Sequence, residues 1–195
     1  QLSRTLLPLG GLTKHEAREI AAAQGFVNAE KPDSQDICFV PDGDYAAFLE
    51  RTRGKKYPAG DFLNENGEKI GTHAGAVRYT IGQRKGLHLA LGYPAYVCAK
   101  DMEKNTVTVA PEERLFSRKA TVGNVNWIAM DALAAPLRAK VKVRYRQSEQ
   151  PAELIPEGAD CVKVIFDSPQ RAITPGQAAV FYDEETVLGG GVIEG

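Results

Sequence analysis

The hydrophobic pattern of the chain changes once, near residue 57. Before that point, apolar residues recur at helical spacing through a segment that contains Ile20. Thr13 and Glu16 precede this face in the order of a capping box, in which each side chain can bond the backbone N–H of the other residue. Gly25 is placed to stop the helix in a left-handed conformation. A second short helix is expected to begin near Asp42, so the first part of the chain is predicted to be helical.

From Pro58 on, short β-rich runs alternate with turn signals. The runs 93–101 and 105–111 predict a hairpin around a turn at 101–105. Five later runs predict further strands, and they lie at 121–128, 137–147, 160–167, 177–183 and 186–193. Pro175 and Gly176 suit the central positions of a type II turn before a closing hairpin. Strands at such regular spacing predict a barrel or a sandwich.

The three glycines 189–191 interrupt the last of these runs. Glycine inside a strand indicates a bulge or a close backbone approach. The pattern as a whole predicts a mainly β protein with a short helical N-terminal segment. Its limits are expected at residues 1–57, 58–116 and 117–195.

Composition adds mostly exclusions. Apolar residues make up 43% of the 195 residues and charged residues 25%, which is ordinary for a packed domain. The formal net charge of −1 provides no global field for nucleic acid or a membrane surface, so any such evidence must be local. No apolar run is long enough to span a bilayer, and no signal peptide is evident at the start. Three widely spaced cysteines form no disulfide framework, which predicts a reducing, cytoplasmic location.

The strongest local pattern is the row of five cations in the run 138–146, "RAKVKVRYR". They fall at every second position, so on a strand they would share one face and the residues between them, Tyr145 included, the other. Their spacing of about 6.6 Å is close to that of successive phosphates on a nucleic-acid strand. A solvated face neutralised by neighbouring acids is an equally good interpretation of this row.

Other candidates favour structural interpretations. The run from Gly82 to Gly86, "GQRKG", lacks the order of a Walker A loop and is best interpreted as a tight basic turn. His73 and His88 stand alone, so no metal site is predicted. Cys38 has acidic neighbours, which would disfavour a thiolate, and local chemistry therefore predicts a small buried residue. The other two cysteines, in strand-like runs, are expected to be structural; they are Cys98 and Cys161.

Four motifs together nevertheless resemble one family: "DSQDICF", "YTIGQRKGL", "KVRYRQ" and "TPGQAAVFYD" followed by "LGGG". In this order they resemble the C-terminal part of the tRNA-specific 2-thiouridylases, which replace the C2 oxygen of the wobble uridine with sulfur. The resemblance implies a catalytic ATP-pyrophosphatase-type domain, a small central β domain, and a C-terminal β-barrel similar to those of translation factors. Residues 1–57 would then be the helical tail and active-site loop of the catalytic domain. The chain opens without Met, and we expect it to be a piece of a longer protein.

The resemblance also implies residue roles. Cys38 would carry the persulfide, with sulfur delivered by a cysteine desulfurase or a relay protein. Arg144, Tyr145 and Gln177 match positions that contact tRNA, and Lys142 and Arg146 are further candidates. ATP would be bound by the N-terminal domain outside this chain, so the chain is expected to be inactive alone. Two alternatives remain: a non-catalytic RNA-binding barrel, and a barrel that binds protein and no RNA.

Overall fold

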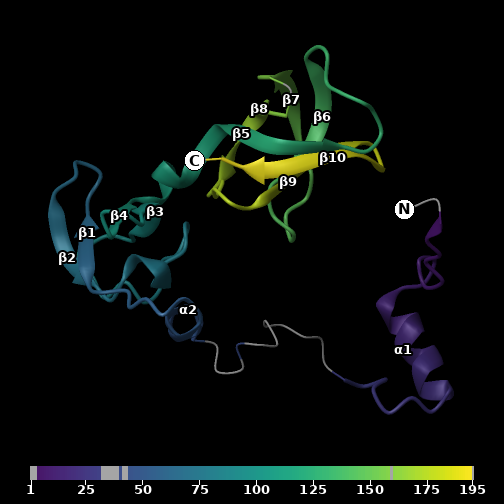
Figure 1. The fold of residues 1–195 in the computed structure, drawn as a ribbon, viewed down its shortest axis with the longest axis horizontal. Helices are drawn as coiled ribbons and strands as arrows, with labels where there is room; N and C mark the ends of the chain where they lie inside the picture. Colours follow the sequence, from purple (N-terminus) through teal and green to yellow (C-terminus); the bar gives the residue numbers. More distant parts are fainter. Residues whose placement is uncertain (1–3, 32–39, 41–43, 159, 195) are drawn as a thin grey trace. The chain divides into compact units, whose positions relative to one another are not determined.

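The computed structural model describes residues 4–31, 40, 44–158 and 160–194. The chain divides into two compact units, residues 1–48 and 49–195. Two short α-helices precede a long series of strands, which confirms the predicted mainly β class (Figure 1). In the part of the chain that is described, no helix has the length and apolar character needed to cross a bilayer.

The first helix, α1 (Lys14–Ala23), begins at the predicted capping box. Oγ1 of Thr13 accepts from the backbone N–H of Glu16, and the Glu16 carboxylate accepts from the backbone N–H of Thr13. Gly25 follows with a φ of 71°, the predicted left-handed stop. The helix buries none of its residues, and Ile20 on its apolar face remains 50% exposed.

The second helix, α2, spans Tyr45–Arg53. The Asp44 carboxylate accepts a hydrogen bond of 3.0 Å from the backbone N–H of Ala47, as an N-cap does. This bond satisfies one of the amides that the first turn of a helix leaves without a partner.

The central β domain is a four-stranded mixed sheet in the order β2-β1-β4-β3. Its strands are β1 (Gly60–Leu63), β2 (Lys69–His73), β3 (Tyr96–Asp101) and β4 (Thr106–Ala110). The hairpin predicted around residues 101–105 is confirmed as β3 and β4, while β1 and β4 pair in parallel. The core of this sheet includes the fully buried Phe62, Val97 and Val107, and the short helix η2 (Ala76–Arg78) lies in the connection from β2 to β3.

His73, at the end of β2, is buried in this core against aromatic rings. Its ring centroid lies 5.1 Å from that of Phe62 and 5.4 Å from that of Tyr79. Nδ1 accepts a hydrogen bond of 3.0 Å from the backbone N–H of Gly75, which makes Nε2 the protonated nitrogen of the neutral ring. Nε2 is buried without a partner among the described residues, and burial lowers the pKa of His73.

The C-terminal strands close into a six-stranded barrel in the order β10-β5-β8-β7-β6-β9, which decides between the predicted barrel and sandwich. They are β5 (Phe116–Trp127), β6 (Leu137–Lys142), β7 (Gln150–Pro156), β8 (Val162–Arg171), β9 (Ala178–Asp183) and β10 (Thr186–Ile193). A short helix, η3 (Glu112–Leu115), leads from the central sheet into β5 (Figure 1). Fully buried Leu154, Phe166 and Phe181 lie at the centre of the barrel. The domain limits near 57 and 116 remain predictions.

The glycines of β10 confirm the predicted bulge and close approach. The register of β10 shifts against both of its neighbouring strands. A methyl group on Gly190 would lie 2.5 Å from the carbonyl oxygen of Ala179, and one on Gly191 would lie 2.5 Å from that of Gly123. The turn before β9 is also as predicted: the N–H of Gln177 bonds the carbonyl of Thr174, and Gly176 has a φ of 84°.

Candidate nucleic-acid interface

The predicted row of cations begins on β6, but the strand ends at Lys142. The expected strand through Gln147 is therefore too long, and Arg144 and Arg146 belong to the connection between β6 and β7. Tyr145, expected on the core-facing side, is 94% exposed. The alternation itself persists up to Val143, which is fully buried like Val141.

Acidic neighbours neutralise part of this row. The Arg138 guanidinium makes two hydrogen bonds of 2.9 and 2.6 Å to the carboxylate of Asp167, and these bonds hold the pKa of Asp167 below its usual range. Nζ of Lys142 lies 3.8 Å from the carboxylate of Glu149. Lys140 has no ion-pair partner among the residues described. The five cations are therefore not one uniform stripe, and those beyond β6 must be considered separately.

Residues 144–147 form a tight turn that is anchored at both ends. The backbone N–H of Gln147 donates to the carbonyl of Arg144 at 3.2 Å, which closes the turn. At one end, Nη2 of Arg144 donates to the carbonyl of Ala172 at 2.6 Å. At the other end, Nε2 of Gln147 donates to Oε1 of the buried Gln170 at 2.7 Å. Tyr145 and Arg146 are the two central residues of this turn, and the anchors hold the exposed tyrosine away from the barrel.

Arg144 has an unusual setting for a surface arginine. Its side chain is half-buried, and its Nε is buried without a partner among the described residues. Burial, and after it the charge of Arg171, lower the pKa of Arg144. The guanidinium remains protonated, because an arginine pKa lies far above neutral pH. Two like charges are thus held near one another at the edge of the barrel.

Gln177 directly precedes the β9 strand and is half-buried. Its backbone bonds to Thr174, and the hydroxyl of Thr174 also lies 3.3 Å from Nη2 of Arg144. The structure therefore brings Arg144 and Gln177 to the same segment, residues 172–177, although 33 positions separate them in the numbering. The amide oxygen of Gln177 is buried without a partner among the described residues.

Cys38 lies outside the described residues. Cys98, on β3, is half-buried, and its thiol lies 3.4 Å from the carbonyl of Thr108. Cys161 directly precedes β8. Burial raises the pKa of both thiols, and acidic neighbours add to the effect at Cys161. In the described part of the chain, no group of three or more His, Cys, Asp or Glu residues could hold a metal ion.

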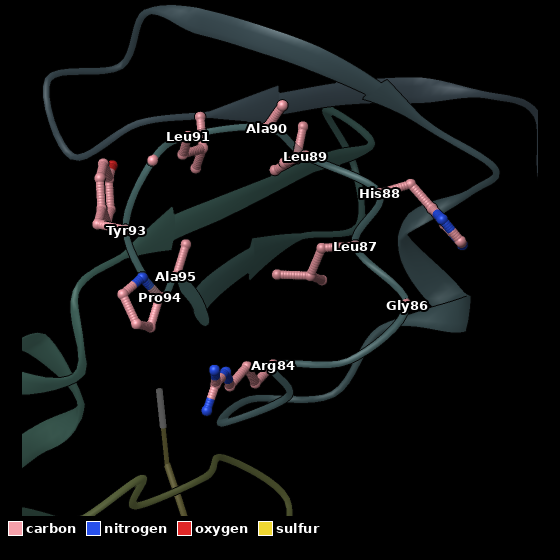
Figure 2. A pocket seen from close by; sticks show the side chains of 11 residues that line it. Arg84, Gly86, Leu87, His88, Leu89, Ala90, Leu91, Tyr93, Pro94 and Ala95 are labelled. Atoms are coloured by element: carbon pink, nitrogen blue, oxygen red, sulfur yellow. The ribbon is translucent and has the colours of Figure 1, made fainter.

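The connection from η2 to β3 curves around an open pocket of about 470 Å³ (Figure 2). Arg84 stands at one end of this loop, Leu87 points into the cavity, and His88 points away from it. The "GQRKG" run is here a loop with two turns, in which Gly82 and Gly86 have φ angles of 87° and 77°. Its basic residues Arg84 and Lys85 are exposed.

Sequence reasoning missed Arg171, the last residue of β8. Its Nε donates to the carboxylate of Glu112 at 2.9 Å, and its guanidinium lies over the ring of Tyr96, 5.4 Å from the centroid. It also missed Gln147 and Gln170, which fix the turn. These are single residues without a local pattern, so only their contacts across the fold identify them.

Three family models match successive parts of the chain. A tRNA methyl transferase HUP domain matches residues 1–42, a tRNA methyl transferase PRC-barrel domain matches 46–111, and an aminomethyltransferase β-barrel domain matches 117–193. The third match covers the six-stranded barrel, and the second covers the central sheet.

Curated relatives match the chain from end to end. The tRNA-specific 2-thiouridylase MnmA of Halothermothrix orenii is 46% identical over 194 residues, which is 100% of this chain and 54% of that protein. The enzyme of the same name from Heliobacterium modesticaldum is 50% identical over 195 residues, 99% of this chain and 51% of the relative. That of Acetivibrio thermocellus is 45% identical over 194 residues. The chain spans about half the length of the curated relatives it matches.

The fold and these matches first define a class. The chain has the domains of a tRNA-modifying protein, because the HUP and PRC-barrel models that match it are both described as tRNA methyl transferase domains. Within that class the curated relatives are 2-thiouridylases, not methyltransferases. The chain belongs to the tRNA-specific 2-thiouridylase family, and the resemblance inferred from the four motifs is confirmed.

Proposed function

We propose that this chain is part of a tRNA sulfurtransferase that replaces the C2 oxygen of the wobble uridine with sulfur. In this proposal the chain contributes two parts of the enzyme: the persulfide cysteine, Cys38, and a surface on the barrel that contacts tRNA. Identity of 45–50% to named 2-thiouridylases along the whole chain supports the reaction. The observation that carries the RNA contact is the anchored turn, which exposes Tyr145 between Arg144 and Arg146.

An exposed aromatic ring between two cations suits single-stranded or unpaired RNA. Bases stack on aromatic side chains, while arginine binds the neighbouring phosphates. The anchors of the turn matter because they order it before RNA arrives, so binding loses less conformational entropy. Gln177 shares the segment that anchors Arg144, and its amide is a second polar group for the same RNA. Lys142 adds a positive charge just before the turn, and Arg146 adds one within it.

The proposed sulfur transfer needs two cysteines. The terminal sulfur of the Cys38 persulfide attacks C2 of the activated uridine, and AMP leaves with the former C2 oxygen. A second cysteine, outside this chain, then attacks Sγ of Cys38. The S–S bond breaks, the sulfur stays on C2, and the two cysteines form a disulfide that a thiol reductant reopens. A cysteine desulfurase or a relay protein supplies the persulfide sulfur.

Neither the glycine run of β10 nor the loop from Gly82 to Gly86 supports an ATP site in this chain. The glycine run of β10 lies inside a paired strand, where a methyl group on Gly190 or Gly191 would meet a carbonyl oxygen at 2.5 Å, so close strand packing explains these glycines. The loop from Gly82 to Gly86 lacks the residue order of a phosphate-binding P-loop. We therefore assign adenylation of the uridine to no residue of this chain, and we propose that the chain alone is inactive.

Thiolation assays test the role of Cys38. In the full-length enzyme, Cys38→Ser should abolish formation of 2-thiouridine and leave the Kd for tRNA unchanged. The 195-residue chain, given ATP, tRNA and a persulfide donor, should form none. Retained activity of the serine variant would refute the persulfide role, and activity of the chain alone would refute its dependence on a further domain.

Filter binding with tRNA tests the surface. Tyr145→Ala should weaken binding by about 1–3 kcal/mol, or roughly 5- to 150-fold, because a stacked base loses its platform. Tyr145→Phe keeps the ring and should bind nearly as the parent does. Equal binding by the alanine variant would contradict the proposed contact. A parent chain that binds tRNA and adds nothing to sulfur transfer would be the RNA-binding module of the alternative, and one that binds no tRNA would leave the protein-binding barrel.

A further inference from the structure

The loop from Thr80 to Gly86 in the central sheet is held by its own glutamine. Oε1 of Gln83 accepts from the backbone N–H of Thr80 at 3.0 Å, and its Nε2 donates to the carbonyl of Lys85 at 2.9 Å. The backbone N–H of Gly82 and the carbonyl of Gln83 both bond to Val97 of β3. The path of the loop is therefore determined before any ligand binds.

The side chains of the two basic residues of this loop take no part in that network, although the backbone carbonyl of Lys85 does. Arg84 and Lys85 are exposed, and neither has an ion-pair partner among the described residues. Figure 2 shows Arg84 where the loop begins its course around the pocket, on the side opposite the apolar residues 89–91. The loop thus presents two adjacent positive charges from a backbone whose position is fixed by hydrogen bonds.

The same loop borders the barrel near Arg144 and Arg171. A methyl group on Gly82 would lie 3.2 Å from Cβ of Ala172, 3.4 Å from Nη1 of Arg171 and 4.0 Å from Nη2 of Arg144. A cavity of about 300 Å³ lies along this seam, lined by Thr80 and Ile81, by residues 98–100 of β3, and by residues 173–175 of the barrel segment. Both guanidinium groups therefore converge on the start of the loop.

This seam carries more positive than negative charge. Glu112 forms an ion pair with Arg171. Nη2 of Arg144 donates to neutral oxygens, and no carboxylate among the described residues pairs with this guanidinium. The positive charges of Arg144 and Arg171 repel one another, and an anion bound between them would offset this repulsion. The arginine turn with Tyr145 begins at Arg144, so the seam continues the surface proposed to contact tRNA.

We propose that the loop residues Arg84 and Lys85, together with Arg171 and Arg144, form a clamp for RNA backbone phosphates across the junction of the central sheet and the barrel. The clamp rests on the proposed tRNA binding and extends it to the central domain. Its partner is the phosphodiester backbone and not a base, because the groups that converge there are cations and the Tyr96 ring beside them is already covered by the Arg171 guanidinium. Gln83 is a positioning residue for the clamp.

The test is the salt dependence of tRNA binding by the 195-residue chain. Each phosphate contact contributes about 0.7–0.9 to the slope of log K against log salt concentration. The double variant Arg84→Gln/Lys85→Gln should therefore lower the magnitude of this slope by about 1.4–1.8. If the variant and the parent bind equally at about 1 M salt, the variant should bind roughly 25- to 60-fold more weakly than the parent at about 0.1 M. Its thermal midpoint should match that of the parent, since both side chains are exposed.

The matched control is Lys55→Gln/Lys119→Gln, which removes two exposed lysines elsewhere and changes the net charge equally. It should leave the slope within about 0.3 of the parent value if local contacts, and not net charge, decide binding. A loop variant that behaves like this control, while Tyr145→Ala still weakens binding, would overturn the clamp and leave the proposed function intact. A parent chain that does not bind tRNA would overturn both. Equal losses in both double variants would also overturn the clamp, because net charge alone would then explain them.

Discussion

Arg144 offers a substitution that separates geometry from charge. Its guanidinium anchors the exposed turn through Nη2, which donates to the carbonyl of Ala172 at 2.6 Å and lies 3.3 Å from the hydroxyl of Thr174. Arg144→Lys retains the positive charge, but a single ammonium group on a flexible stem cannot reproduce the planar fork of arginine. The lysine variant should therefore lose the anchor and retain the electrostatics.

The expected size follows from the contacts. A hydrogen bond from a charged donor contributes about 1.5–3 kcal/mol. The Ala172 carbonyl still accepts from the hydroxyl of Thr174 at 2.9 Å, so no buried acceptor is left without a partner. The substitution also removes the buried Nε, which has no partner among the described residues. Both offsets place the net loss near the lower end, at about 1–2 kcal/mol, and for a chain of this size that lowers the Tm by about 2–8 °C.

Thermal unfolding followed by circular dichroism measures this loss, and tRNA binding at several salt concentrations measures the charge. We expect a lower Tm with an unchanged salt slope. Arg84→Lys is the control, since Arg84 is exposed and its side chain makes no hydrogen bond to a described residue; its Tm should equal that of the parent. An Arg144→Lys variant with the parental Tm would refute the anchoring role of this guanidinium.

Two further predictions concern stability. The free energy of unfolding should fall as the pH drops below about 6.5, because burial lowers the pKa of His73 in the folded protein and the unfolded chain therefore binds the proton more readily. Urea titrations at pH 7.5 and 5.5 measure this fall in the parent and in the His73→Gln variant. Equal pH dependence of the unfolding free energy in both proteins would contradict the prediction. Gly190→Ala should destabilise the barrel by about 1–3 kcal/mol, because its methyl group would meet the carbonyl oxygen of Ala179 at 2.5 Å, whereas Gly11→Ala, with no atom within 4 Å, should have almost no effect on urea unfolding. A neutral Gly190→Ala would show that the closing strand has room to shift.

Local patterns predicted the elements whose causes are local. The capping box at Thr13, the hairpin around residues 101–105 and the turn at Gly176 each depend on residues a few positions apart, and each is confirmed. The choice between barrel and sandwich depends on which distant strands pair, and alternation cannot show that. The barrel closes through three pairings of strands that do not follow one another in the chain: β5 with β8, β5 with β10, and β6 with β9.

The end of β6 shows why the site was harder to predict. The alternation of cations and apolar residues runs on past Lys142, and no glycine or proline follows to interrupt it. The strand ends because the turn at 144–147 is drawn to β8 and to the segment after it, through Gln170 and Ala172. Those partners lie more than 20 positions away in the sequence, so no local pattern includes them. The role of Cys38 stays a prediction.

The pairing of β10 has a consequence for the growing chain. Because β10 bonds to β5 on one side and β9 on the other, neither of those strands has its second neighbour until residues 186–193 have been made. A nascent barrel therefore displays two open edges, with backbone groups ready to pair with strands of other chains. A stop codon ahead of β10 would keep most of the core residues and produce a protein prone to aggregate. Solubility of this domain thus depends on its last strand.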